Sequence, residues 1–332
     1  MGSKFLKHLI TSYFPGGLTS KTAPKFPNTI LCDYYAMMEM EANEWRSKWG
    51  ESTNARRRRR WKRWASTPLT AIEFLARINR SEVREIAEHI SSSCEGLRVG
   101  VVSGFLPELA YCPVISRARM GVRALRTMVI LVEELKKLGH PVSTLELAAG
   151  SVIRGIRLDE DEDVYVAISN QTITSHLFLC WNLRWALMRC PSDKIKIALE
   201  LEPGFFFLLR NLKTLQSLAD RIAGSRALKN RVFFNLDISH WRLANIKPNE
   251  VRGELARRIL HAHISGHHHC AHFGDIPLYD LNTNGDYQPW LRLLKTLKER
   301  EDAIYDGGLS FELEVVRDTA QLTKALAEFD QV

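Results

Sequence analysis

Short apolar runs alternate with amphipathic segments along the chain from about Arg98 onward. The runs are rich in Val, Ile, Leu and Phe, which is typical of buried strands, and the segments between them repeat apolar residues at helical spacing. This alternation predicts a parallel sheet built from βα units. The predicted strands cover residues 97–103, 143–148, 197–202, 232–237, 259–265 and 309–316, and the predicted helices cover residues 119–139, 175–189, 212–224, 249–258 and 287–300.

Two details of this region are more specific. A loop containing the acidic run Asp159–Asp163 is expected between the second of these strands and the helix that follows it. That helix, residues 175–189, is expected to turn one apolar face toward the core. The face is drawn from Leu177, Phe178, Trp181, Leu183 and Leu187.

The first 96 residues must supply two more strands if the sheet closes into an eight-stranded barrel. Phe5–Phe14 is the predicted first strand, and Thr70–Leu75 is either the second strand or the beginning of the helix that continues through Ser81–Ile90. Residues 19–66, approximately, are interpreted as an insertion or lid. We therefore expect a single α/β domain over residues 1–332, a (β/α)8 TIM barrel with a basic N-terminal insertion.

Metal-binding side-chain types stand near the ends of four predicted strands. Because a strand alternates its faces, residues two apart project the same way. Carboxylates and imidazoles are costly to bury without a partner, and one divalent cation can satisfy several of them at once. The strand ends therefore predict a metal site. The same-face pairs are Glu200 with Glu202, Asn235 with Asp237, His261 with His263, and Glu312 with Glu314.

Composition and charge agree with a large globular enzyme. The chain has 332 residues, is 45% hydrophobic and carries a formal net charge of +8, much of which comes from Arg56–Arg60 and the basic residues just after it. Such a run is usually an exposed, solvated segment, which is the interpretation favoured here. The alternative is a nucleic-acid contact, since arginine pairs with phosphate and the nearby Trp61 and Trp64 can stack on bases. The acidic run Asp159–Asp163 is a further candidate partner for the arginines.

Cysteine spacing and the N-terminus favour a cytoplasmic protein. The six cysteines show no Cys-x-x-Cys spacing and are interpreted as reduced thiols. Residues 1–10 have too short an apolar run for a signal peptide, and Leu6 stands where a myristoylation motif needs Ser or Thr. No stretch approaches the length of a membrane span, so no membrane partner is expected.

Four motifs in strand order resemble a known superfamily. They are Leu-Glu202-Pro, Asp237-x-x-His240, His261-x-His263-Ile-Ser and Gly307-Gly-Leu-Ser-Phe-Glu312-x-Glu314. The series resembles the xylose isomerase-like TIM barrels, which include the sugar phosphate isomerases and epimerases and the endonuclease IV nucleases. The resemblance covers about residues 97–320, and its most specific element is Asp-x-x-His after one strand followed by His-Ile-Ser at the end of the next.

The resemblance implies one divalent metal ion, Mn²⁺, Mg²⁺, Co²⁺ or Zn²⁺, held at the carboxyl end of the barrel. The implied ligands are Glu202, Asp237, His263 and Glu312. Glu202 is preferred over Glu200 because it stands beside Pro203 at the end of its strand. Three alternates stay open: Glu200, His261, which is interpreted as a core histidine, and Glu314, which shares a face with Glu312.

The reaction implied is that of an isomerase or epimerase acting on a polyhydroxylated small molecule, a sugar or polyol. Proton transfer would pass through a metal-stabilised enediolate, with Glu202 and Glu312 as acid and base. His240 would bind substrate, and the loop after His263 would contribute His269 and His272. The superfamily's substrate-binding Arg is absent from this loop, which argues against a phosphorylated or conventional sugar substrate.

Other functions remain open at this stage. A lyase or dehydratase would use the same enolate chemistry. An endonuclease IV-like phosphodiesterase acting on DNA would need three metal ions and further His ligands, and a noncatalytic barrel would need none. A homo-oligomer is compatible with each of these functions.

Overall fold

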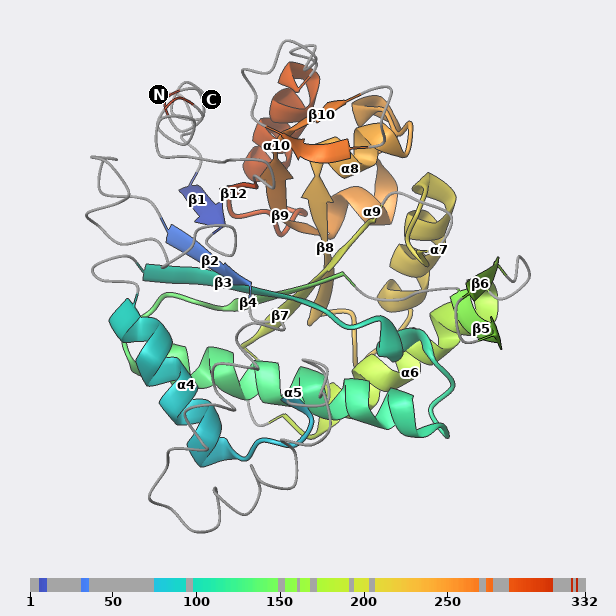
Figure 1. Ribbon diagram of the computed structural model, residues 1–332. Helices are drawn as coiled ribbons and strands as arrows, with labels where there is room; N and C mark the ends of the chain where they lie inside the picture. Colours follow the sequence, from blue (N-terminus) through green and yellow to red (C-terminus); the bar gives the residue numbers. More distant parts are fainter. Residues whose placement is uncertain are drawn as a thin grey trace.

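The computed structural model describes residues 6–10, 31–35, 75–93, 98–148, 153–159, 162–167, 172–190, 194–202, 207–268, 273–276, 287–312, 324 and 327. Eight strands form one parallel sheet, and the first of them pairs with both the last and the second, so that the strand order closes on itself (Figure 1). The order around the sheet is β1 (Leu6–Ile10), β12 (Gly308–Phe311), β9 (Ile259–Ile264), β8 (Val232–Asp237), β7 (Lys196–Glu200), β4 (Thr144–Ala148), β3 (Arg98–Phe105) and β2 (Leu31–Tyr35).

The predicted parallel α/β sheet is confirmed. The six strands expected after residue 96 are β3, β4, β7, β8, β9 and β12. The second strand of the sheet is Leu31–Tyr35, which pairs with β3 and lies inside the range interpreted as an insertion, whereas residues 70–74 of the segment expected as a strand or a helix start lie outside the described residues. The five residues of Leu31–Tyr35 include Asp33 and give only a weak strand pattern. The arginine run and any lid lie outside the described residues.

Helices cover the outer face of the sheet (Figure 1). Their starts and ends lie within a few residues of those expected, apart from the short helix α8, which directly follows β8 and was not predicted. The residues expected to form a helix over 249–258 instead form a 3-10 turn and a short helix. The helices are α4 (Arg80–Ser93), α5 (Ser116–Lys137), α6 (Thr172–Met188), α7 (Leu212–Ala223), α8 (Ile238–Leu243), α9 (Gly253–Arg257) and α10 (Gln288–Glu299), with 3-10 turns η1 (Pro107–Ala110) and η2 (Pro248–Glu250).

Two antiparallel hairpins interrupt the βα series. β5 (Ile153–Asp159) pairs with β6 (Glu162–Ala167), so Asp159, Glu162 and Asp163 of the acidic run lie in paired strands rather than in the loop that was expected, and residues 160 and 161 lie outside the described residues. β10 (Gly266–His268) pairs with β11 (Phe273–Ile276) just beyond the end of β9.

Strand alternation separates an apolar layer from a polar barrel interior. One face of each strand packs against the helices, and on β4, β7 and β8 this face is formed by Leu145, Leu147, Ile197, Leu199, Phe234 and Leu236, all 0% exposed. The opposite face of the same strands points into the barrel. There the strands place Glu146, Glu200, Asn235 and Asp237, which are also buried.

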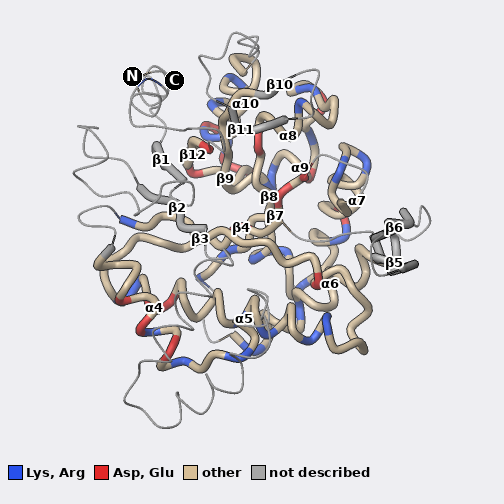
Figure 2. Tube along the Cα trace, viewed as in Figure 1, with Lys and Arg blue, Asp and Glu red and all other residues tan. Residues whose placement is uncertain are grey.

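Charges follow the direction of the strands (Figure 2). In the described barrel strands after residue 96, the basic residues Arg98 and Lys196 stand at the amino ends, whereas Glu200 and Asp237 stand at the carboxyl ends.

The helix prediction over residues 175–189 needs one correction. Leu183 and Leu187 are buried as expected, but Leu177 and Trp181 are 47% and 63% exposed.

The three described cysteines for which the structure gives a state, Cys112, Cys180 and Cys190, are free thiols, as predicted. Among the described residues, no helix combines the length and the apolar character that a bilayer span requires.

Asn182 on α6 is buried, whereas the adjacent Trp181 is exposed. The Asn182 side chain is 0% exposed, and its amide nitrogen donates to the carbonyl oxygens of Leu109 (2.8 Å) and Tyr111 (2.9 Å). It thereby fixes η1, the segment that follows β3, onto α6.

We expect Asn182→Ala to lower the free energy of unfolding by about 2–4 kcal/mol, because two backbone carbonyls lose their shared donor. Urea unfolding followed by circular dichroism measures this. Arg84→Ala is the control, since it removes only the exposed Arg84–Glu88 pair and should change stability by less than about 0.5 kcal/mol. Equal unfolding midpoints for the two variants would contradict the role of Asn182.

Candidate metal centre

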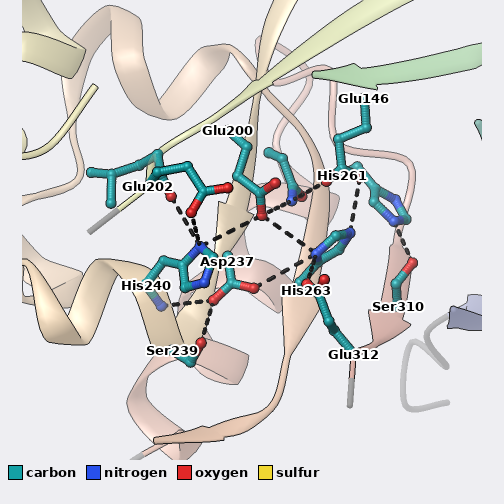
Figure 3. A network of polar contacts seen from close by, with 12 residues as sticks. Glu146, Glu200, Glu202, Asp237, Ser239, His240, His261, His263, Ser310 and Glu312 are labelled. Atoms are coloured by element: carbon teal, nitrogen blue, oxygen red, sulfur yellow. Dashed lines mark hydrogen bonds and ion pairs between the residues drawn. The ribbon is translucent and has the colours of Figure 1, made fainter. Parts of the chain in front are cut away.

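Four residues from consecutive strands converge on one point at the carboxyl end of the barrel (Figure 3). Glu200, Asp237 and His263 come from β7, β8 and β9, and Glu312 directly follows β12. Each offers one ligand atom, and these atoms all lie within 4.8 Å of one another. Of the predicted ligands, the structure thus brings together Asp237, His263 and Glu312, with Glu200 as the fourth member.

Nδ1 of His263 lies at the centre of the cluster. It is 2.7 Å from Glu312 Oε2, 3.5 Å from Glu200 Oε1 and 3.6 Å from Asp237 Oδ2. The imidazole is 1% exposed, so these contacts are shielded from water. Three carboxylates therefore lie around a single nitrogen atom.

Asp237 is oriented by the helix that follows it. It is the N-cap of α8, and its Oδ1 accepts from the backbone amide of His240 (2.7 Å) and from the hydroxyl of Ser239 (2.8 Å). Its Oδ2 is buried, has no hydrogen-bond partner and faces His263. A buried carboxylate oxygen without a hydrogen-bond partner is costly, and a bound cation would supply the missing partner.

The electrostatics of the cluster point the same way. Burial raises the pKa of Glu200 well above its usual value, and the negative charge of Glu146 raises it further. Burial alone would lower the pKa of His263, but the charges of Glu146 and Glu312 hold it well above its usual value. Burial would raise the pKa of Asp237, but the charges of His240 and His263 and the hydrogen bond from the His240 amide lower it. The cluster brings three carboxyl groups to one imidazole, and this donor set fits a divalent cation.

Glu202 lies beside this cluster rather than in it. Its Oε2 is 3.8 Å from Nδ1 of His240, and its side chain is 25% exposed. The same Nδ1 lies 3.1 Å from the carbonyl oxygen of Leu201, which can only accept, so Nδ1 is the donor. Glu200 and Glu202 share a face, but Glu202 is about 7 Å farther along the chain direction, and the sequence alone could not tell which one reaches His263.

The remaining candidates divide into two groups. His261 is buried, and its Nε2 lies 2.6 Å from the hydroxyl of Ser310, in agreement with a core histidine. It also belongs, with Glu146 and His263, to a second set of closely spaced ligand atoms. His269, His272 and Glu314 lie outside the described residues.

The sequence prediction missed the interior residue Glu146 and named Asn235 only as the same-face neighbour of Asp237. Glu146 lies in the middle of β4 and is 2% exposed, and Asn235 on β8 is 0% exposed. The amide nitrogen of Asn235 donates to both Glu146 Oε1 (3.1 Å) and Glu200 Oε1 (3.2 Å). The signal that could have identified Glu146 is a single acid within an otherwise apolar strand.

Solved structures that match this one include a xylose isomerase domain protein, a D-tagatose 3-epimerase-like protein, D-psicose 3-epimerase and a probable 3-DHS dehydratase. A xylose isomerase domain protein from Planctomyces limnophilus is 12% identical with a TM-score of 0.58, over 99% of this chain and 96% of that chain. D-psicose 3-epimerase is 12% identical with a TM-score of 0.55, over 98% of both chains. The IolI protein, solved with a bound zinc atom, is 14% identical with a TM-score of 0.51, over 79% of this chain and 85% of that chain.

The chain has the fold of the xylose isomerase-like TIM barrels. This agrees with the resemblance drawn from the four sequence motifs. No protein-family model and no curated protein matches the sequence. At these low identities the solved structures establish the fold alone, so the function must be argued from the site.

We expect Asn235→Asp to destabilise the protein by about 3 kcal/mol at pH 8, because a donor between two carboxylates becomes a third carboxylate. The loss should shrink at pH 5, since the added acid can then take up a proton in the folded protein. Urea unfolding at both pH values measures the change.

Asn211→Asp is the matched control. Asn211 is the N-cap of α7, where its side chain accepts from the backbone amide of Thr214, and aspartate caps helices equally well. The same substitution should therefore leave stability unchanged there. A loss at position 235 that does not depend on pH would contradict the electrostatic argument.

Proposed function

We propose that this protein is a divalent-metal-dependent isomerase or epimerase of a polyhydroxylated small molecule, a sugar or polyol. The observation that carries the proposal is the convergence of Glu200, Asp237 and Glu312 on Nδ1 of His263 at the carboxyl end of a parallel barrel. Active sites of TIM-barrel enzymes lie at this end of the strands. The similarity in fold to D-psicose 3-epimerase and to the zinc-containing IolI structure supports the proposal.

The metal ligands in this proposal are Glu200, Asp237, His263 and Glu312, so that Glu200 replaces Glu202 in the set expected from the sequence. Carboxylate and imidazole donors suit Mn²⁺, Mg²⁺, Co²⁺ or Zn²⁺. A divalent ion bound there would polarise a substrate carbonyl and stabilise the negative charge that develops on its oxygen.

The proton transfer is assigned to Glu202 and Glu312. Glu202 is the more exposed of the acids on β7 and its continuation, and it lies within 3.8 Å of His240 without belonging to the group of four. In this proposal it removes the proton from the carbon next to the carbonyl, and Glu312 returns a proton from another side. His240, whose ring is oriented by the Leu201 carbonyl, binds a substrate hydroxyl.

We expect the chelator-treated protein to bind one divalent ion per chain, and Glu200→Gln and Asp237→Asn to weaken that binding more than about 100-fold, beyond the range typical of residues that only support a ligand. Asp237→Asn keeps the N-cap of α8 because asparagine also caps helices. Isothermal titration calorimetry with Mn²⁺, Co²⁺ and Zn²⁺ measures the affinities.

Glu202→Gln is the control for this measurement and should bind metal as the parent does. If Glu202→Gln loses the ion while Glu200→Gln keeps it, the ligand set proposed here is wrong and the set drawn from the sequence motifs is favoured. Three ions per chain would favour the endonuclease IV-like alternative.

We expect the metal-loaded protein to exchange deuterium from D₂O into the carbon next to the carbonyl of a ketose or related polyol. In Glu202→Gln and Glu312→Gln the exchange rate should fall about 10²–10⁴-fold, the usual contribution of a general acid or base. Proton NMR on a panel of ketoses follows the exchange. Cleavage of abasic-site DNA without any exchange would contradict the proposal.

A further inference from the structure

Glu146 contacts the side of His263 that faces away from the carboxylate cluster (Figure 3). Its Oε2 lies 2.9 Å from Nε2 of His263, although the two groups are not aligned as a regular hydrogen bond. Both side chains are buried, Glu146 at 2% exposed and His263 at 1%. The position is on β4, a strand that contributes none of the four proposed ligands.

The two ring nitrogens of His263 therefore have different neighbours. Nδ1 faces Glu312, Glu200 and Asp237, and Nε2 faces Glu146. A neutral imidazole carries one N–H and one lone pair, and a metal ion takes the lone pair. The nitrogen opposite the metal must then carry the hydrogen, and a carboxylate beside it fixes that tautomer and the orientation of the ring.

We infer that Glu146 is a positioning residue, which accepts the Nε2–H of His263 and thereby presents the Nδ1 lone pair to a metal ion held with Glu200, Asp237 and Glu312. The inference rests on the proposed function, because it assumes that the cluster binds a metal.

Asn235 links this supporting acid to the ligand set. One amide nitrogen donates to Oε1 of Glu146 and to Oε1 of Glu200. The Glu146 carboxylate is therefore held by Asn235 through one oxygen and turned toward His263 with the other. Asn235 is fully buried, so water does not compete for these contacts.

The first test measures the tautomer of His263 directly in the parent protein loaded with Zn²⁺. Two-dimensional ¹H–¹⁵N NMR on histidine-labelled protein should show a protected Nε2–H for His263, assigned by its absence in His263→Gln. Metal-bound Nδ1 and protonated Nε2 support the inference. Protonation at Nδ1, or metal at Nε2, overturns it without need of a Glu146 variant.

The second test removes the charge of Glu146. In Glu146→Gln the affinity for Co²⁺ should fall about 10–100-fold while one ion still binds at saturation, which is the usual effect of losing a carboxylate that supports a metal-bound histidine. The visible absorption spectrum of bound Co²⁺ should also change, because the ring is less firmly held.

Glu134→Gln is the matched control for this substitution. Glu134 on α5 is also buried, at 6% exposed, and it pairs with Arg80 and Lys137. Its replacement also removes a buried charge, but it should leave the Co²⁺ affinity and spectrum as in the parent.

The outcomes separate this inference from the function on which it rests. A parent protein that binds no divalent ion overturns both. A parent that binds one ion, with Glu146→Gln equal to it in affinity and in the Nε2–H signal, overturns the positioning role alone. Two ions in the parent and one in Glu146→Gln would make Glu146 a ligand in the second set, with His261 and His263, and would also overturn it.

Discussion

The burial of several carboxylates around one imidazole is the constraint on which the rest of the structure depends. Glu146, Glu200 and Asp237 are each 8% or less exposed, and Glu312 contacts the same histidine. Such a group is costly to take out of water unless its charges are compensated. Asn235, Ser239 and the His240 amide supply fixed donors, but these donors carry no charge. A cation is the compensation that fits the geometry.

The parallel barrel makes this arrangement possible because every strand has one face under the helices and one face toward the barrel interior. On β7, Ile197 and Leu199 pack under the helices, whereas Ala198 and Glu200 face inward. The apolar layer supplies the burial that stabilises the domain, and the interior layer is free to carry polar groups. Because all strands run the same way, their carboxyl ends meet, and residues distant in sequence meet with them.

The same geometry explains why the fold does not identify the reaction. Proteins with this fold and 11–12% identity to the chain include a sugar epimerase and a probable dehydratase. The chemistry of the site lies instead in particular side chains. They are the pair formed by Glu202 and His240 beside the cluster, and the acid on β4 behind His263. These residues define what a substrate would meet and how firmly the central histidine is held.

The sequence by itself determined the strands after residue 96 and the residue types at their ends. Apolar runs with period two and helical spacing between them are local signals, and they were sufficient to predict β3, β4, β7, β8, β9 and β12 and to place Asp237, His263 and Glu312 at strand ends. The strand Leu31–Tyr35 was missed because five residues with an internal aspartate give little local signal, and only pairing with β3 defines it.

Tertiary structure decided which of the candidate side chains meet. Glu200 and Glu202 are two residues apart and project from the same face, so no local rule could choose between them. The distance of each to His263 depends on where β7 ends relative to β9. Glu146 and Asn235 had no partner in their own segments. Their hydrogen bonds and contacts join β4, β7, β8 and β9 across gaps of 35 to 117 residues (Glu200 to Asn235 and Glu146 to His263). Strand register sets such contacts, and register is a property of the closed sheet rather than of any one strand.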